Sequence, residues 1–142
     1  MENPIKSIVA FNKKAGLLDN GYNDFLEASC LIEEAFEGFD HLGNYSAKDR
    51  ARLLMEDANF LGTNVDRLDK ACDATVFAIG SMAKLGLNAQ EITKALNIVM
   101  KANNQKLGMP KDEYGKLQKP DNFNPPEPQL QLLLDEVKSR QQ

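Results

Sequence analysis

Apolar and polar residues follow one another along most of this chain with the period of an α-helix. Apolar side chains recur three or four positions apart, and no segment shows the strict apolar–polar alternation of a half-buried strand. Glycine, asparagine and other polar residues interrupt the pattern between the helical segments. The sequence therefore predicts an all-α helical bundle, with helices at about residues 5–14, 23–39, 46–62, 64–85 and 88–105.

Several predicted helix ends carry their own local signals. Asn23 and Ser46 stand directly before apolar periodic segments and are predicted N-caps. Asn88 is followed three residues later by Glu91, which is the spacing of a capping box. Gly86 is expected to end the preceding helix. Each signal would satisfy backbone groups that a helix end otherwise leaves unpaired.

The chain changes character after Gly108. Residues 109–128 hold five of the six prolines and few large apolar residues. The lysines of this stretch are Lys111, Lys116 and Lys119. Because proline cannot continue a helix, we expect an extended tail here, followed by a short leucine-rich helix over about residues 129–138. The predicted organisation is a helical catalytic domain of residues 1–108 and a C-terminal segment, 109–142, that packs on the same domain or on a partner subunit.

Composition narrows the classes of function. The chain has 142 residues, of which 42% are hydrophobic and 27% charged, as in an ordinary globular domain. Its net charge of −4 argues against a nucleic acid or an anionic membrane as the main partner. No apolar stretch approaches the roughly 20 residues of a membrane span, and no leader pattern is present. If so acidic a protein binds a polyphosphate, metal ions or a local cluster of lysines must offset the repulsion between its own negative charge and that of the phosphates.

Cysteine and histidine are too few for a zinc site or a thiol–histidine nucleophile. The chain has two cysteines, Cys30 and Cys72, and one histidine, His41. Both cysteines lie in apolar helical segments, so we expect them to be reduced core residues of a cytoplasmic protein.

Two of the predicted helices carry rows of carboxylates. Glu34 and Glu37 lie about 60° apart on the 23–39 helix, opposite its apolar stripe. Asp66, Asp69 and Asp73 share one face of the 64–85 helix within about 60°. The members of the apolar stripe are Phe25, Ala28, Ile32, Phe36 and Phe39. Such rows are commonly solvated faces, and that interpretation remains open.

The surroundings of the aspartate row favour a cleft. Beyond Asp73 the same face continues into Val76, Phe77 and Gly80, and the only charge from residue 74 to residue 87 is Lys84. We therefore expect this helix to be buried from two sides. Packed together, the two rows would repel unless divalent cations joined them, and oxygen ligands select Mg²⁺, with Mn²⁺ possible. Two such ions can polarise a phosphoryl group and activate a water molecule.

Motifs along the chain resemble those of the all-α nucleoside triphosphate pyrophosphohydrolases, the MazG-like and phosphoribosyl-ATP pyrophosphohydrolase-like group. Residues 33–37 (EEAFE) resemble the EExxE motif, and residues 66–80 (DRLDKACDATVFAIG) resemble the second acidic helix with its ExxD motif. Residues 103–106 (NNQK) are similar to the Asn-x-x-Lys that ends the next helix. Residues 115–126 (GKLQKPDNFNPP) resemble a GKxxKP…PP tail. The resemblance runs in order from Phe11 to Pro126.

The resemblance implies hydrolysis of a nucleoside triphosphate, or a related nucleotide, at the α–β phosphate bond, giving the monophosphate and pyrophosphate. It implies Mg²⁺ held by Glu34, Glu37 and the aspartates, with Glu33 or its neighbour Glu34 orienting the attacking water. The residues implied to meet the substrate are Asn103, Lys106, Lys116 and Lys119. It also implies a homodimer or homotetramer. The chain departs from the family in having Asp66 where ExxD has glutamate.

Several alternatives remain at this stage. A second alignment ends the ExxD motif at Asp73 and puts Lys70 in the glutamate position, so which two aspartates bind metal is open. We favour Asp69 and Asp73, because side chains four residues apart on a helix aim at one site, with Asp66 third. Phe11, Phe77 and Tyr114 are candidates for stacking on a base. A non-catalytic helical module that binds a nucleotide or a protein, and a purely structural helical oligomer, are the competing hypotheses.

Overall fold

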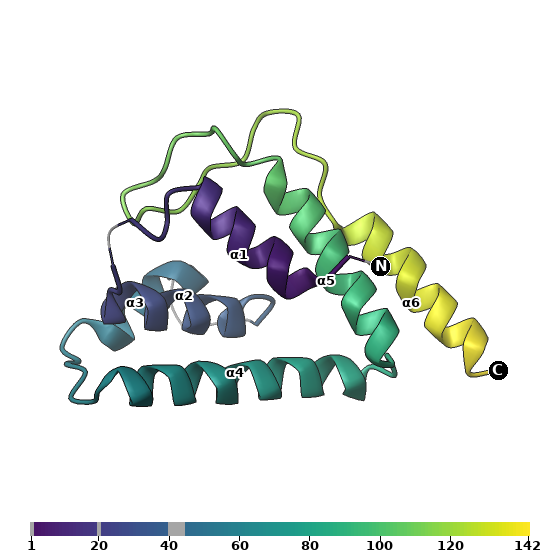
Figure 1. Cartoon of the computed structure of the whole chain (residues 1–142), viewed down its shortest axis with the longest axis horizontal. Coiled ribbons are helices and arrows are strands. Elements are labelled where there is room, and N and C mark those ends of the chain that lie inside the picture. The colour runs from purple at the N-terminus through teal and green to yellow at the C-terminus, as the bar shows by residue number, and fades with distance from the viewer. Residues whose placement is uncertain (1, 20, 40–44) are drawn as a thin grey trace. The chain divides into compact units, whose positions relative to one another are not determined.

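In the computed structural model, residues 2–19, 21–39 and 45–142 are described, and His41 lies outside them. The described residues form six α-helices and no strand, which confirms the all-α class (Figure 1). The helices are α1 (Pro4–Lys14), α2 (Asp24–Phe36), α3 (Ala47–Met55), α4 (Asn64–Lys84), α5 (Ala89–Asn104) and α6 (Glu127–Arg140).

The chain divides into two compact units. Unit 1 comprises Met1–Asp19 and Val65–Gln142, and therefore contains α1, α4, α5 and α6. Unit 2 comprises Asn20–Asn64 and contains α2 and α3. The EExxE-like residues thus belong to unit 2, whereas the aspartate row and the lysines belong to unit 1.

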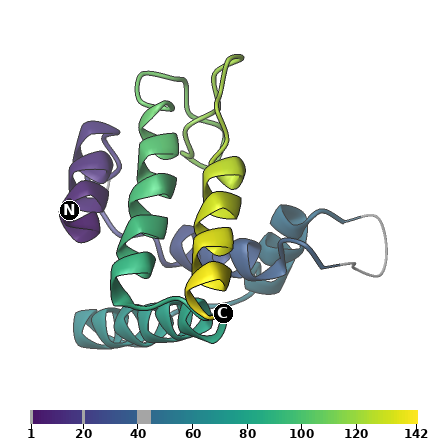
Figure 2. The same ribbon diagram turned by 90° about the vertical axis from the view of Figure 1, so that its right-hand side faces the viewer.

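Unit 1 has an apolar core between α5 and α6. Ile92 and Ala95 of α5 are buried against Leu133 and Val137 of α6, together with Leu87 of the preceding turn. The half-buried residues that pack around this core are Met82, Leu96, Ile98 and Leu130. Figure 2 shows α5 and α6 side by side and antiparallel, and α1 packs on α5 as well. Both helices contribute residues three or four positions apart, so each buries one stripe.

The turn from α4 to α5 is held by hydrogen bonds from both of its ends. The Asn88 backbone N–H donates to Glu91 Oε1 (2.8 Å) and the Glu91 N–H donates to Asn88 Oδ1 (2.9 Å), which confirms the capping box. Gly86 ends α4 with a φ of +99°, a conformation that favours glycine. Arg140 of α6 donates to Glu91 and to the Gly86 carbonyl (2.9 Å), so the last turn of α6 is fixed to this turn.

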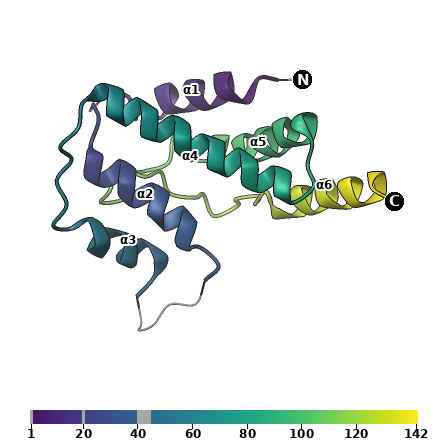
Figure 3. The same cartoon turned by 90° about the horizontal axis from the view of Figure 1, so that it is seen from below.

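Unit 2 is a pair of packed helices, α2 and α3 (Figure 3). The predicted N-caps are confirmed, since Asn23 Oδ1 accepts from the Leu26 N–H (3.1 Å) and Ser46 Oγ accepts from the Asp49 N–H (3.1 Å). The predicted ends are wrong. Helix α2 stops at Phe36 rather than residue 39, because Glu37 turns to an extended ψ of 135° and Gly38 takes a φ of +83°. Helix α3 stops at Met55 rather than residue 62.

The buried face of α3 also differs from the expected one. Leu53 and Leu54, predicted to face inward, are exposed, whereas Ala51 and Arg52 are buried. The buried partners on α2 are Ser29 and Glu33. The helical period alone could not select this face, because Arg52 becomes a favourable inward residue only when a carboxylate lies opposite it.

Helix α4 contains no buried residue over its whole length. Its contribution to the unit 1 core is the half-buried Met82 near its C-terminal end. The expectation of a helix buried from two sides is therefore not met. An isolated helix with large exposed apolar residues is only marginally stable in water, so α4 needs further packing.

Candidate functional site

The EExxE-like residues of α2 divide into one buried and two exposed carboxylates. Glu34 and Glu37 are exposed. Glu37 is the C-cap of α2, and its backbone N–H still donates to the Glu33 carbonyl (3.1 Å), which keeps Glu37 one helical turn from Glu34. Both carboxylates are therefore open to solvent.

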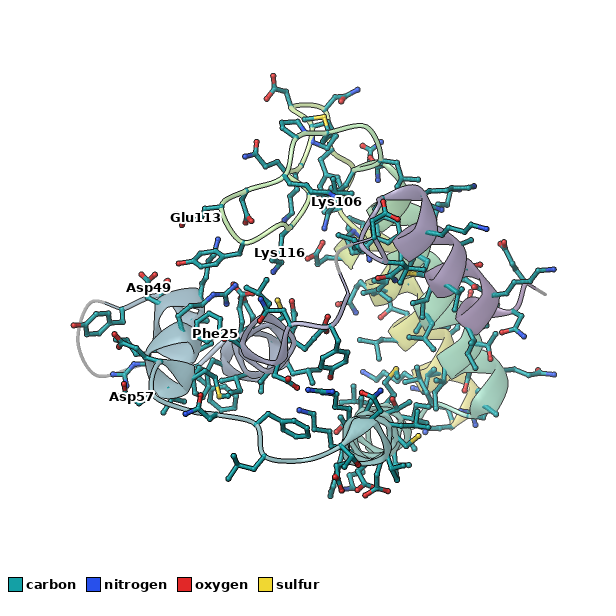
Figure 4. All side chains as sticks on the ribbon, turned by 60° about the vertical axis from the view of Figure 1, so that its left-hand side comes forward. Phe25, Asp49, Asp57, Lys106, Glu113 and Lys116 are labelled. Carbon is teal, nitrogen blue, oxygen red and sulfur yellow. The ribbon has the colours of Figure 1, made fainter. Side chains whose placement is uncertain are left out.

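Glu33 is engaged by an arginine that the sequence analysis overlooked. Its Oε2 lies 3.9 Å from Arg52 Nη1, and both side chains are less than one-tenth exposed. The carboxylate and the guanidinium are therefore buried next to each other between α2 and α3. Arg52 was missed because it lies in an otherwise helix-forming run, where an arginine reads as a surface residue. Figure 4 shows the side chains of α2 and α3, with Phe25 labelled on α2 and Asp49 on α3.

The three aspartates of α4 lie on one exposed face of that helix. Asp66, Asp69 and Asp73 are all exposed, and Asp69 and Asp73 are one turn apart. Their oxygen donors suit Mg²⁺ or Mn²⁺ in chemistry. Among the described residues, however, no three histidine, cysteine, aspartate or glutamate side chains come together as ligands of one metal ion.

Two of the predicted substrate-binding lysines meet around an aromatic ring in unit 1. Lys106 Nζ lies 5.7 Å and Lys119 Nζ 5.2 Å from the centre of the Phe123 ring. A cation at this distance is attracted to the face of the ring. The ring thereby gathers two ammonium groups that the sequence separates by more than ten residues. Phe123 was quoted in the tail motif, but this gathering role was not predicted.

Gln105 holds the tail segment that contains Phe123 in place through two hydrogen bonds. Its side-chain Nε2 donates to the Asn124 carbonyl (2.8 Å), and its Oε1 accepts from the Asn124 N–H (2.9 Å). The two bonds pair the amide of Gln105 with a backbone peptide, as in a sheet ladder. This contact sets the tail against the C-terminal end of α5, directly beside Lys106.

Lys116 lies on a tight hairpin of the same tail, and Figure 4 labels it together with Lys106, just beyond α5. The hairpin closes with an isolated antiparallel bridge between Lys111 and Leu117. Asp112 Oδ1 accepts from the N–H groups of Tyr114 (2.8 Å) and Lys116 (3.0 Å), which fixes the turn. The expected extended tail is therefore ordered by local hydrogen bonds.

Asn103 and the stacking candidates are distributed more widely. Asn103 is half-buried on α5 and its Nδ2 donates to Met100 Sδ (3.8 Å). Phe11 and Tyr114 are half-buried, whereas Phe77 is exposed on α4. These side chains do not single out a base-binding position.

Two cavities of unit 1 lie elsewhere. One, of 720 Å³, is lined by residues of α5 and α6 together with Glu2 and Ser7, and the other, of 520 Å³, lies between α5 and the prolines before α6. None of the predicted site residues lines either cavity. These two cavities are therefore separate from the predicted site residues.

Comparison with known proteins adds no relative. No family model matches the chain, and no curated protein or solved structure matches it. None of the helices that the described residues form is both long and apolar enough to cross a membrane.

Proposed function

We propose that this protein is a Mg²⁺-dependent nucleoside triphosphate pyrophosphohydrolase. It would cleave the α–β phosphate bond of a nucleoside triphosphate, or of a related nucleotide, to give the monophosphate and pyrophosphate. The observation that supports this best is the exposure of all five predicted metal ligands on their helices. These are Glu34, Glu37, Asp66, Asp69 and Asp73.

Each group has a role in the proposed reaction. Glu34, Glu37 and the aspartates, chiefly Asp69 and Asp73, would hold Mg²⁺. The metal, when bound, would neutralise phosphate charge and lower the pKa of the attacking water. Glu34 is the better candidate to orient that water, because Glu33 is occupied by Arg52. The charge of Glu33 would instead keep α3 fixed to the helix that carries the motif.

The lysines supply the positive charge that an acidic protein lacks. Lys106 and Lys119, gathered by Phe123, would receive phosphate oxygens, with Lys116 and Asn103 contributing to substrate binding. Two ammonium groups held in advance cost less to order than two free side chains. Assembly as a homodimer or homotetramer in the cytoplasm belongs to the same proposal, and it is supported by two free cysteines and an exposed α4.

A non-catalytic helical nucleotide- or protein-binding module is the second candidate. The burial of Glu33 favours it, because this pairing removes one of the three motif carboxylates from chemistry. Such a module would still bind Mg²⁺–nucleotide and would be stabilised by it, without turnover.

The test is pyrophosphate release from a panel of nucleoside and deoxynucleoside triphosphates and phosphoribosyl-ATP, with and without Mg²⁺. We expect release that needs Mg²⁺ and falls by at least about 100-fold in Glu37→Gln and in Asp73→Asn, because each removes a metal ligand. Glu27→Gln, an exposed change on α2 outside the motif, is the matched control and should keep full activity.

The outcomes separate the candidates. Stabilisation by Mg²⁺–nucleotide without release would favour the binding module. No release, together with equal melting temperatures with and without metal, would remove the metal site and leave a structural oligomer.

A further inference from the structure

The smaller cavity of unit 1, of 520 Å³, lies where the C-terminal end of α5 meets the segment that leads into α6. Figure 2 shows this end of α5 beside the start of α6. The volume is within the range of roughly 300–1,000 Å³ that small-molecule sites commonly have. All the residues that line the cavity belong to unit 1, so its walls do not depend on where unit 2 lies.

One wall of this cavity is made of proline. Pro125, Pro126 and Pro128 line it, and because proline has no backbone N–H, these residues present ring carbons and no donor. The wall is held at both ends, since Asn124 makes the two hydrogen bonds described above and the Leu130 N–H donates to the Pro126 carbonyl (3.0 Å). A wall that is ordered in advance costs a ligand less to bind.

Apolar residues of α5 complete the part of the cavity that suits a ring. Ile98 and Ala102, one helical turn apart, also line it. Proline rings pack well on aromatic faces, as they do when proline-rich segments dock in aromatic grooves. A flat aromatic ring therefore suits the space between α5 and the prolines better than a flexible chain does.

Among the described residues that line this cavity, Lys101 alone is charged. It forms no ion pair with a carboxylate in the described part of unit 1, whereas Lys94, two turns earlier on α5, is paired with Glu136 (3.5 Å). Gln129 of α6 lines the same cavity, and its side-chain amide can donate hydrogen bonds. The cavity therefore provides one uncompensated positive charge and one amide donor, which together suit an anion.

The neighbouring, larger cavity limits the charge that such an anion can carry. Ile98, Lys101 and Gln129 line both cavities, so the two adjoin there. The lining of the larger cavity includes Glu2 and Glu136, whose carboxylates would repel a second negative charge. A single lysine compensates one charge, so a monoanion fits better than a phosphate dianion. Its apolar body belongs on the proline side, where the described lining holds no carboxylate.

We propose that the smaller cavity binds a planar aromatic ring that carries one negative charge, as an aromatic carboxylate does. The ring packs against the prolines and Ile98, and the carboxylate meets the Lys101 ammonium and the Gln129 amide. This site goes beyond the proposed function, because none of the residues predicted to bind metal or nucleotide lines it. It can be tested without metal or nucleotide, so its failure is distinguishable from a failure of the proposed hydrolysis.

The first measurement is a titration of the full chain with 2-naphthoate, followed by ¹H–¹⁵N NMR spectroscopy. We expect the largest shift changes at the backbone amides of Ile98, Lys101 and Gln129, with a Kd of about 1 mM or tighter for a ligand of this size. The neutral 2-naphthalenemethanol, which has the same ring, should bind at least about 10-fold more weakly. Decanoate, which has the charge without a flat ring, should also bind more weakly. No binding by wild type, as would result if residues of unit 2 fill the cavity, shift changes centred elsewhere, or equal binding of the three compounds would overturn the proposal.

Two substitutions separate the charge from the ring. Lys101→Gln should weaken 2-naphthoate binding about 10-fold and leave the binding of 2-naphthalenemethanol unchanged, because it removes only the charge. Pro125→Ala should weaken both compounds by a similar factor of about two to five, because it removes apolar contact surface. The matched controls are Lys138→Gln and Pro110→Ala, which are exposed changes outside the cavity and should bind as wild type does. Circular dichroism verifies that each variant stays helical. Unchanged affinity in Lys101→Gln, or an equal loss in Lys138→Gln, would contradict the site.

Discussion

The interiors of the two units are made of different kinds of side chain. Among the described residues, those buried in unit 1 are Leu87, Ile92, Ala95, Met100, Ala102, Leu133 and Val137, all apolar. Those buried in unit 2 are Ser29, Glu33, Ala51 and Arg52, and only the alanine is apolar. Burial of apolar surface stabilises a unit without regard to geometry, whereas a buried ion pair contributes only while both partners stay in place.

The comparison bears on where the proposed chemistry lies. Unit 2 carries Glu34 and Glu37 at the C-terminal end of α2. The buried pair of Glu33 and Arg52 joins this part of α2 to α3. Unit 1 carries Lys106 just after α5, and Lys116 and Lys119 on the tail, all outside its apolar core. We infer that the apolar core is the main source of stability in unit 1. In unit 2 the buried polar pair stabilises the fold less, but it fixes the orientation of the helix that carries the carboxylates.

Removing one partner of the buried pair should have the largest effect on stability. Arg52→Ala leaves the Glu33 carboxylate buried without its cation, and we expect a loss of about 3–5 kcal/mol in the free energy of unfolding. Urea denaturation gives the size of the loss, and hydrogen exchange shows whether it is confined to α2 and α3. The double change Glu33→Leu with Arg52→Leu should restore most of the loss, because it removes both charges. A double variant as unstable as the single one would show that the pair is not the reason.

Cutting into the apolar core of unit 1 should have a comparable or smaller effect. Leu133→Ala is expected to cost about 2–5 kcal/mol, because it leaves a cavity between α5 and α6. Leu132→Ala, next to it on α6 but largely exposed, is the matched control and should cost much less. Thermal unfolding of both variants measures the difference. Equal losses would contradict the assignment of the core to the Leu133 side of α6.

The smallest effect is a pH dependence at the turn from α4 to α5. The hydrogen bond from Arg140, followed by that from the Asn88 N–H, holds the pKa of Glu91 below its ordinary value of 4.5. Because the folded pKa is the lower one, the stabilisation is present above about pH 4.5 and is lost as the pH falls through the folded value. Glu91→Gln should therefore be less stable than wild type at neutral pH, and the gap should narrow in acid. A gap that stays constant from pH 7 to pH 3 would contradict this linkage, and Glu127→Gln provides the control.

Local signals in the sequence predicted where helices begin. Asn23, Ser46 and Asn88 each accept a hydrogen bond within their own helix, so their role depends on neighbours three residues away. The ends at residues 39 and 62 were placed too late, because periodicity continues past the point where Glu37 and Gly38 change the backbone. The helix starts could be predicted because a capping side chain marks each of them in the sequence. The ends of α2 and α3 depend on backbone conformation, which the periodic pattern does not show.

Features that join distant residues could not be predicted in the same way. Nothing in the sequence around Arg52 shows that Glu33 lies opposite it, and nothing around Phe123 shows that Lys106 and Lys119 meet at its ring. The α4 aspartates were correctly expected on one face, but the period alone did not reveal how exposed the rest of that helix is. The shared metal site remains a prediction.

The central claim of the proposed function is that Glu34, Glu37, Asp69 and Asp73 all serve as ligands of the proposed Mg²⁺. Titration with Mn²⁺, followed by electron paramagnetic resonance and calorimetry, tests it directly on wild type, on Glu34→Gln with Glu37→Gln, and on Asp69→Asn with Asp73→Asn. We predict that wild type binds Mn²⁺ and that either pair of changes abolishes this binding, while Glu27→Gln leaves it intact, because each row supplies only part of the ligand set. Binding that survives the loss of one row, or a wild type that binds no metal, would contradict the claim.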